Sequence, residues 1–227
     1  MDEEGNPTWS IIYDVYKNHN ILDQFVTTCE AAEKYQPKVK RSAQKESSGA
    51  MFAVGSRKAY DKKPIGPYIS KSGYFPKDIQ EFNNQWSQMA ISVERFTAMF
   101  FGFIKKEAAE LILRYDMERF IIAPNEPNSV VSAFFTKGYS VKSHKDNDEM
   151  QHGYGLILET DKVVGGDFVL PEYETRLKLC NNTWWFWKSA EDVHGTTVFS
   201  ENEEKRYTFV VALARRLAKA AEKESFQ

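Results

Sequence analysis

Two histidines and an aspartate in the second half of the chain have the residue types and spacing of a metal site. His144 and Asp146 lie two residues apart in Ser143-His-Lys-Asp146, and on a strand such residues point to the same side. A second imidazole, which we assign to His194, would complete a set of two histidines and one carboxylate. Such a set leaves the opposite positions of an octahedral ion open, which suits a non-haem Fe(II) that binds an oxidant beside a chelating co-substrate.

Arg206 and Thr208 come after His194 and are two residues apart, so on a strand they face the same side. A planar guanidinium grips a carboxylate through two hydrogen bonds, and a neighbouring hydroxyl can add another. The pair therefore suits the distal carboxylate of 2-oxoglutarate. The alternative is a surface arginine, because the charged run Glu203-Glu-Lys precedes it. The order along the chain, a ligand pair, a third ligand and then the arginine, favours the binding site.

Other side chains near the proposed ligands leave the assignment open. A His-x-Asp pair occurs by chance in many proteins, and the alternative is a solvated turn in which His144 and Asp146 contact only their neighbours. His152 follows soon after and could replace one of the ligands. Asp148 and Glu149 are in the same stretch, so either carboxylate could be mistaken for Asp146.

The second half of the chain has the pattern of short antiparallel strands. Segments rich in β-branched and aromatic residues are separated at even intervals by Gly, Asn, Asp or Pro, which is typical of a sandwich or barrel. The predicted strands are residues 130–136, 154–160, 168–170, 175–179, 183–187 and 207–211.

The first half and the C-terminal tail have helical patterns instead. Prolines interrupt residues 36–73, where we expect no regular element. Apolar residues recur in steps of three and four over residues 21–29, 79–104 and 108–115, which predicts a helix over each range. Residues 212–223 have a charged, helical pattern and are also predicted to form a helix.

The composition is that of an ordinary globular protein. Of the 227 residues, 42% are hydrophobic and 27% are charged, and there is no run of about 18 apolar residues, the length that would span a membrane. Cys29 and Cys180 are far apart, and we expect thiols in a reducing compartment. The N-terminus lacks the basic and apolar regions of a secretory signal. We therefore expect an intracellular protein, cytoplasmic or nuclear, with no membrane partner.

Charge is distributed unevenly along the chain. The net charge is −2, yet the segment from Lys34 to Lys63 contains nine Lys or Arg against two Asp or Glu. Clustered cations neutralise phosphates, so this basic segment is a candidate contact for DNA. A solvated loop is the other interpretation, and the acidic net charge favours it.

Over about its last hundred residues the chain resembles the Fe(II)- and 2-oxoglutarate-dependent dioxygenase superfamily. The family pattern of His-x-Asp, a distant His and an Arg on the next strand is similar to His144, Asp146, His194 and Arg206, and Arg206-Tyr-Thr208 is similar to its Arg-x-Ser pair. The resemblance implies an α+β fold whose core is a double-stranded β-helix, or jelly roll, with N-terminal helices packed outside. It also implies one domain over residues 1–227.

Within that single domain, the expected parts are helical support and a basic loop over residues 1–127, the β-helix core over 128–213 and a C-terminal helix over 214–227. The resemblance further implies Fe(II) as the cofactor and 2-oxoglutarate as a co-substrate, with oxidation of a C–H bond as the reaction. The overall pattern is also similar to the Tet/JBP-like branch, which oxidises methylated bases, so a methylated nucleobase in DNA is the expected substrate. Two alternatives stay open: a peptidyl or small-molecule hydroxylase of the same superfamily, and a non-catalytic cupin-like metal-binding module.

Overall fold

Strands dominate the described part of the chain. The computed structural model describes residues 8–36, 48–57, 132–146 and 149–214, together with residues 5, 38, 66–67 and seven positions between 85 and 99. None of the helices described is long and apolar enough to cross a membrane. The elements are β1 (Trp9–Ile12), α1 (His19–Tyr35), β2 (Ser48–Arg57), β3 (Gly66–Pro67), β4 (Ser132–Ser140), β5 (Glu149–Glu159), β6 (Phe168–Leu170), the 3-10 helix η3 (Pro171–Tyr173), β7 (Thr175–Leu177), β8 (Thr183–Trp187), β9 (Gly195–Thr196), the 3-10 helix η4 (Glu203–Lys205) and β10 (Arg206–Ala214).

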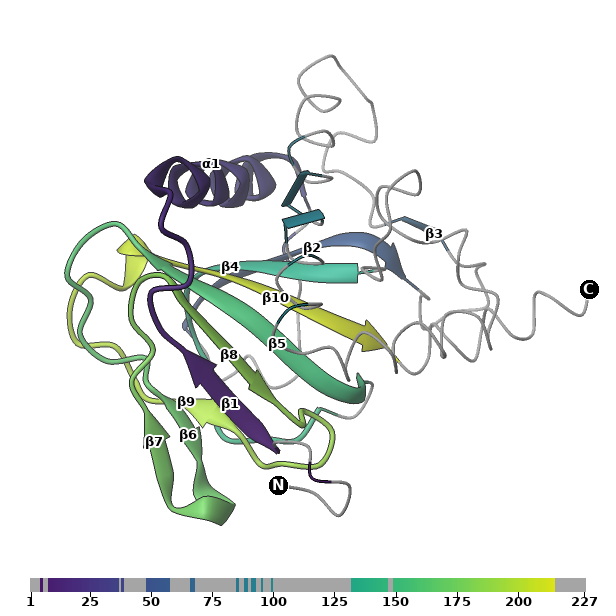
Figure 1. Cartoon of the computed structure of the whole chain (residues 1–227), viewed down its shortest axis with the longest axis vertical. Helices are drawn as coiled ribbons and strands as arrows, with labels where there is room; N and C mark the ends of the chain where they lie inside the picture. The colour runs from purple at the N-terminus through teal and green to yellow at the C-terminus, as the bar shows by residue number, and fades with distance from the viewer. Residues whose placement is uncertain are drawn as a thin grey trace, which may run out of the picture.

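Two antiparallel sheets form the core of the fold. The large sheet has the strand order β1-β8-β5-β10-β4-β2-β3 and the small sheet has the order β7-β6-β9. After β4 the chain passes back and forth between them: β5 is in the large sheet, β6 and β7 in the small one, β8 in the large, β9 in the small and β10 in the large. This alternation is the double-stranded β-helix that the family resemblance implied, and the expectation is confirmed (Figure 1).

The large sheet separates a hydrophobic core from a cavity. Side chains alternate between the two faces of a strand, so Tyr207 and Phe209 of β10 pack in the core beneath α1. Arg206 and Thr208 of the same strand line a cavity on the opposite face, between the large and small sheets. Strands β4, β5 and β8 divide their side chains in the same way.

Helix α1 packs against the outer face of the large sheet, as predicted, and lies on the far side from β6 and β7 (Figure 1). The side chain of Asn18 accepts a hydrogen bond from the N–H of Asn20 and caps the start of the helix. The helix ends at Tyr35, and the next residue, Gln36, has the extended backbone expected before Pro37. Its buried positions recur in steps of three and four: Leu22, Phe25, Cys29 and Ala32.

Two glycines of β5 make room for two tryptophans of β8. Gly153 pairs with Trp187 and Gly155 pairs with Trp185 across the two strands. The two indole rings lie parallel, with their centroids 5.4 Å apart. A Cβ atom on Gly155 would lie 2.4 Å from the Trp185 ring and 2.9 Å from the backbone oxygen of Phe209. Glycine is therefore required here by the closeness of its neighbours.

The structure corrects the interpretation of the first half as helices and an irregular basic loop. Residues 36–73 contain β2 and β3, and β1 precedes the first helix. β2 pairs with β4 and β1 pairs with β8, so these strands widen the large sheet on both sides. Glycine and serine weaken the strand pattern of β2, and β1 has only four residues. Both are formed by pairing with distant strands, which local sequence does not reveal.

The strands predicted in the second half are confirmed, with shifts at several ends. β6 and β8 have the predicted bounds, β4 and β5 are longer, and β7 ends at Leu177. The predicted tail helix is wrong at its start, because β10 continues to Ala214, which still pairs with β5. Pairing with β5 outweighs the helical preference of alanine there. The remainder of that helix lies outside the described residues.

The two other predicted helices fall mostly outside the described residues. All of 108–115 does so. Within 79–104 the structure describes seven positions, and each is helical. Met89, one of these, is buried in the core beneath α1.

Replacing Gly155 with alanine is expected to destabilise the protein by about 1–3 kcal/mol, the usual cost of overpacking a closely packed site. The added methyl group has to displace the Trp185 ring or the β10 backbone. Chemical denaturation measures the free energy of unfolding. Val198→Ala is the control, because Val198 is 81% exposed and such a change costs less than about 0.5 kcal/mol. Equal stability of the two variants would contradict the packing described.

Candidate metal and co-substrate site

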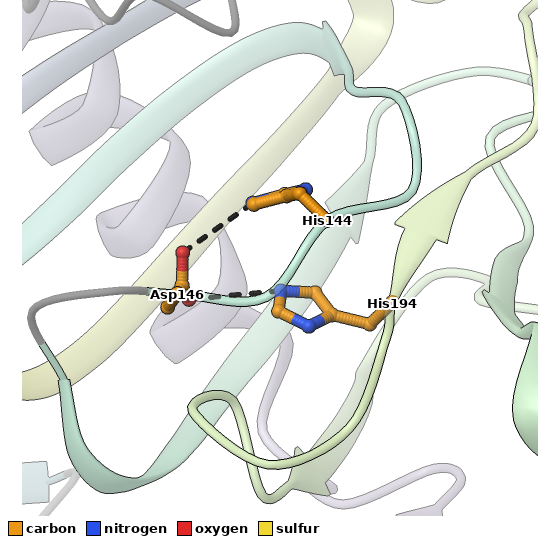
Figure 2. A group of neighbouring side chains, drawn as sticks. All are labelled: His144, Asp146 and His194. Atoms are coloured by element: carbon orange, nitrogen blue, oxygen red, sulfur yellow. Dashed lines mark ion pairs between the residues drawn. The ribbon is translucent and has the colours of Figure 1, made fainter.

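The structure brings His144, Asp146 and His194 together at one point. The Nε2 atom of His144 lies 3.3 Å from one carboxylate oxygen of Asp146, and the Nε2 atom of His194 lies 3.6 Å from the other. Figure 2 shows both imidazoles pointing toward this carboxylate. One potential ligand atom from each residue lies within 4.8 Å of the other two. The arrangement can hold a metal ion.

Backbone hydrogen bonds hold the three residues in these positions. The N–H of His144 donates to the carbonyl of His194 at 2.8 Å, and the N–H of His194 donates back to the carbonyl of His144 at 2.9 Å. This antiparallel bridge places the two imidazole rings 4.7 Å apart, centroid to centroid. The N–H of Asp146 donates to the carbonyl of Ser189 at 2.9 Å. All three ligand candidates are thus fixed through the main chain.

The environment of each histidine favours one tautomer. The Nδ1 atom of His144 lies 2.7 Å from the carbonyl oxygen of Lys142, and that of His194 lies 3.0 Å from the carbonyl oxygen of Asp192. A carbonyl can only accept, so Nδ1 carries the proton in both rings and Nε2 keeps its lone pair. Burial lowers the pKa of His194, although the neighbouring Asp146 carboxylate opposes this. Both effects of the surroundings on this ring, the tautomer and the lowered pKa, favour a neutral ligand.

The three residues line a cavity of about 100 Å³ between the two sheets. His194 is buried in its wall, stacked near Phe168 and tilted against Trp187. The rest of the lining is mostly apolar and comes from β2, β4, β5, β6, β8, β9 and β10 and from the segments after β4 and β7: Met51, Phe134, Thr136, Tyr139, Val141, Ile157, Phe168, Leu179, Trp185, Trp187, Gly195, Thr196, Arg206, Thr208 and Val210.

Arg206 lies in the same cavity wall, so the alternative of a surface arginine is wrong. The residue is only 2% exposed. Its Nη1 donates a 2.7 Å hydrogen bond to the carbonyl of Gly166, and its guanidinium lies over the ring of Phe199. Burial lowers its pKa to about 10, although Glu159 opposes this. Arg206 is still protonated at neutral pH.

One donor of Arg206 lacks an acceptor. Its Nε–H is buried and makes no hydrogen bond within the described part of the protein. The closest carboxylate oxygen, on Glu159, is 3.9 Å away and too far for a hydrogen bond. A buried donor without an acceptor costs free energy. A bound carboxylate would supply the missing acceptor.

Thr208 lies two residues after Arg206 on β10 and faces the same cavity, as the spacing predicted. It lies directly opposite Thr136 of β4, and the two hydroxyl groups are hydrogen-bonded to each other. Both threonines line the cavity with Arg206. A cation and two hydroxyl groups are therefore available on this wall.

A family model supplies the deciding comparison. Residues 16–198 match the model of the Tet-like 2OG-Fe(II) oxygenase superfamily. The chain belongs to this superfamily. The protein is accordingly a dioxygenase of a family that uses Fe(II) and 2-oxoglutarate. The match ends before Arg206, so the case for this residue comes from its burial and its missing acceptor. No curated protein matches the sequence.

Solved structures of other oxygenases share the fold. The structure of NgTET1 in complex with 5mC DNA has a TM-score of 0.60 and 11% identity, covering 94% of this chain and 74% of that chain. A prolyl hydroxylase from Trichoplax adhaerens, solved in complex with a hypoxia inducible factor oxygen degradation domain peptide, has a TM-score of 0.50 and 8% identity, covering 97% and 88%. At such low sequence identities, the similarity to these two structures concerns the fold alone.

Some residues of the oxygenase site had no signal in the sequence. Glu159 lies directly across from Arg206 in the sheet, which only the register of β5 and β10 reveals. Gly166 approaches Arg206 so closely that a Cβ atom there would lie 2.0 Å from Nη1. The competing candidates remain untested, since Asp148 and the side chains of Glu149 and His152 lie outside the described residues.

The acid opposite Arg206 gives the oxygenase a specific pH dependence. Burial raises the pKa of Glu159 above its usual 4.5, with Arg206 and Lys178 opposing the effect. The folded protein therefore retains a proton that the unfolded chain releases between these pKa values. Since the unfolded state binds fewer protons there, this group makes the free energy of unfolding fall as the pH rises through that window.

The side chain at position 159 does not titrate in Glu159→Gln, so this group should no longer lower the free energy of unfolding as the pH rises. Its free energy of unfolding minus that of the unsubstituted protein should increase from pH 4 to the raised pKa and then level off. Urea denaturation of both metal-free proteins over this pH range measures the difference. A difference independent of pH would show that Glu159 titrates normally.

Proposed function

We propose that His144, Asp146 and His194 bind Fe(II) and that Arg206, with Thr208, binds 2-oxoglutarate for the oxidation of a substrate C–H bond. The observation that carries this assignment is a single cavity lined both by the His-Asp-His group and by a buried arginine that lacks an acceptor. A non-catalytic metal-binding module would have no need of that buried cation.

The donor set fits Fe(II). Two neutral imidazole nitrogens and one carboxylate are the ligands of non-haem Fe(II) oxygenases, which keep further coordination positions open. The Nδ1 atoms of His144 and His194 are both occupied by backbone carbonyls. Such partners fix the ring orientation and raise the basicity of the ligand nitrogen. The surroundings therefore suit two histidines that bind a metal through Nε2.

The part of the cavity lined by Arg206 fits a dicarboxylate co-substrate. The guanidinium of Arg206 is anchored at Nη1 by Gly166, and its Nε–H still needs an acceptor. The hydroxyl groups of Thr208 and Thr136 face the same cavity. A carboxylate placed here would receive charge-assisted hydrogen bonds in a low-dielectric setting, where such bonds are strong.

Each part of the cavity has a separate task in the proposed reaction. Bound Fe(II) would activate dioxygen, the oxidant, with 2-oxoglutarate as the co-substrate that supplies two electrons, and a substrate C–H bond would then be oxidised. Arg206 orients the co-substrate through its guanidinium. Phe134, Phe168 and Trp187 also line the cavity and exclude water, which protects a reactive site from side reactions.

Anaerobic titration tests the assignment. Purified protein is mixed with Fe(II) and 2-oxoglutarate, and the visible absorption of the metal–keto acid chelate is recorded. We expect a band in the unsubstituted protein and none in His144→Ala. Arg206→Ala should need roughly 10- to 100-fold more 2-oxoglutarate, because a hydrogen bond to a charged group is worth about 1.5–3 kcal/mol.

Arg176→Ala is the matched control for Arg206→Ala. Arg176 also pairs with a carboxylate, that of Asp167, but it is exposed and does not line the cavity. Its titration should resemble that of the unsubstituted protein. Absence of the band from folded, unsubstituted protein would overturn the proposed function and favour a binding module.

For the substrate we propose a methylated nucleobase in DNA. The matching family model is Tet-like, and NgTET1, whose fold is similar, was solved with 5mC DNA. Strand β2 adds an observation from this chain. Its Met51 lines the cavity, and in the sequence the basic segment Lys34 to Lys63 extends on both sides of the strand. Five cations come before the strand, one is its last residue and three come after it: Lys34, Lys38, Lys40, Arg41 and Lys45, then Arg57, then Lys58, Lys62 and Lys63.

In the sequence, the basic segment therefore flanks a strand that lines the cavity. An enzyme that oxidises a base in duplex DNA has to extrude the base into a pocket and hold the phosphates around it. A strand that forms part of the cavity wall and carries cations at both ends meets both demands. Aromatic rings in the cavity, such as Phe134 and Trp187, offer faces for stacking.

Salt dependence of DNA binding tests this choice of substrate. We expect that the double variant Lys40→Ala/Arg41→Ala binds a duplex containing 5-methylcytosine more weakly than the unsubstituted protein. The slope of log K against log salt should be smaller by about 2, or about 1 for each lost phosphate contact. Fluorescence anisotropy at several salt concentrations measures both quantities.

Lys17→Ala/Lys162→Ala removes two exposed cations elsewhere and serves as the charge-matched control. Its slope should equal that of the unsubstituted protein. Equal slopes for both double variants, or no salt-sensitive binding at all, would contradict a DNA substrate. A peptidyl or small-molecule hydroxylase would then be the better assignment.

A further inference from the structure

A single carboxylate connects the two segments that carry the metal ligand candidates. Glu172 lies in η3, and one of its oxygens is 3.2 Å from the ammonium of Lys145. Its other oxygen accepts a 3.0 Å hydrogen bond from the N–H of Val193. Lys145 stands between His144 and Asp146 in the sequence, and Val193 immediately precedes His194. Glu172 therefore contacts a neighbour of each of the three ligand candidates.

The next residue of η3 strengthens the same connection. The hydroxyl of Tyr173 donates a 2.8 Å hydrogen bond to the carboxylate of Asp192. Asp192 is buried, and its carbonyl receives the Nδ1–H of His194. Glu172 and Tyr173 thus hold two consecutive residues before His194. The side chains of Glu172 and Tyr173, here called the brace, therefore join η3 to the segments that carry the metal ligand candidates.

The brace lies where regular pairing stops. His144 and His194 form an isolated bridge rather than part of a strand, and Asp146 is beyond that bridge, with one backbone hydrogen bond to Ser189. The main chain also joins the two segments at Thr196–Val141 and at Asp146–Ser189, and side-chain contacts add to these restraints. Glu172 provides such a contact from outside the cavity.

We propose that Glu172 is a positioning residue, which holds His194 in place for metal binding mainly through Val193, with a smaller contribution through Lys145 to the position of His144 and Asp146. The inference rests on the proposed function, because it assumes that these three residues bind the metal. Outer groups that orient metal ligands typically contribute 10- to 100-fold to metal affinity.

The two contacts of Glu172 do not contribute equally. Lys145 and Glu172 are both half-exposed, and ion pairs of this kind add little because water screens them. The hydrogen bond from Val193 is held by the backbone and is the stronger restraint. The pKa of Glu172 is lowered first by this N–H and only then by Lys145. A glutamine, which keeps an acceptor, should therefore preserve most of the effect.

Metal titration of the full chain separates these contributions. Metal-free protein is titrated with Co(II) as the probe, with calorimetry for affinity and visible absorption for ligand geometry. We expect Glu172→Ala to bind Co(II) about 10- to 100-fold more weakly, with an altered spectrum. Glu172→Gln and Lys145→Ala should stay within about threefold of the unsubstituted protein, which corresponds to less than about 1 kcal/mol.

Glu191→Ala is the matched control. It removes an exposed carboxylate that pairs with Lys188 at 3.6 Å in the same region, and it should leave Co(II) affinity unchanged. Thermal unfolding of the metal-free proteins tests for a general structural effect. Glu172→Ala should unfold close to the temperature of Glu191→Ala, because both changes remove an exposed carboxylate.

Three results would overturn the inference. Unchanged Co(II) affinity in Glu172→Ala would remove the positioning role. Equal losses in Glu172→Ala and Glu191→Ala, or a metal-free Glu172→Ala that is as destabilised as its metal binding is weakened, would show a general structural effect. Failure of the unsubstituted protein itself to bind Co(II) is a different result, since it would overturn the proposed function as well.

Discussion

The pair of backbone hydrogen bonds between His144 and His194 is the interaction on which the site depends. These residues lie 50 positions apart in the chain, and the bridge sets their rings 4.7 Å from each other. It forms only where the segment after β4 meets the segment before β9, so both sheets must already be in register. The elements between the two histidines, β5 to β8, return the chain to this point.

Strand β10 couples the site to the core. Its alternate residues Tyr207 and Phe209 are buried under α1, while Arg206 and Thr208 face the cavity. A shift of β10 by one residue would exchange the two sets. The hydrophobic core therefore fixes which way the arginine points, and the position of a charged group is determined by apolar packing on the opposite side of the sheet. Sites on such paired strands are held more rigidly than sites on loops.

Much of the site and the strand half could be predicted from the sequence, because both depend on short-range patterns. The spacing of His144 and Asp146 and the alternation along β10 are local. Strand β2 was missed because it owes its existence to pairing with β4. Glu159 and Glu172 were missed for the same kind of reason: one acquires its partner from the register of two strands, the other from a turn that meets two distant segments.

The separation of His144 and His194 along the chain also has a thermodynamic consequence. An unfolded chain does not hold them together, so a metal that binds this site binds the native state in preference to the unfolded one. Metal concentration then becomes part of the folding equilibrium, and each tenfold rise above the dissociation constant adds about 1.4 kcal/mol to the stability. Bound iron would thus add to the stability of the native state as well as supply the metal for the reaction.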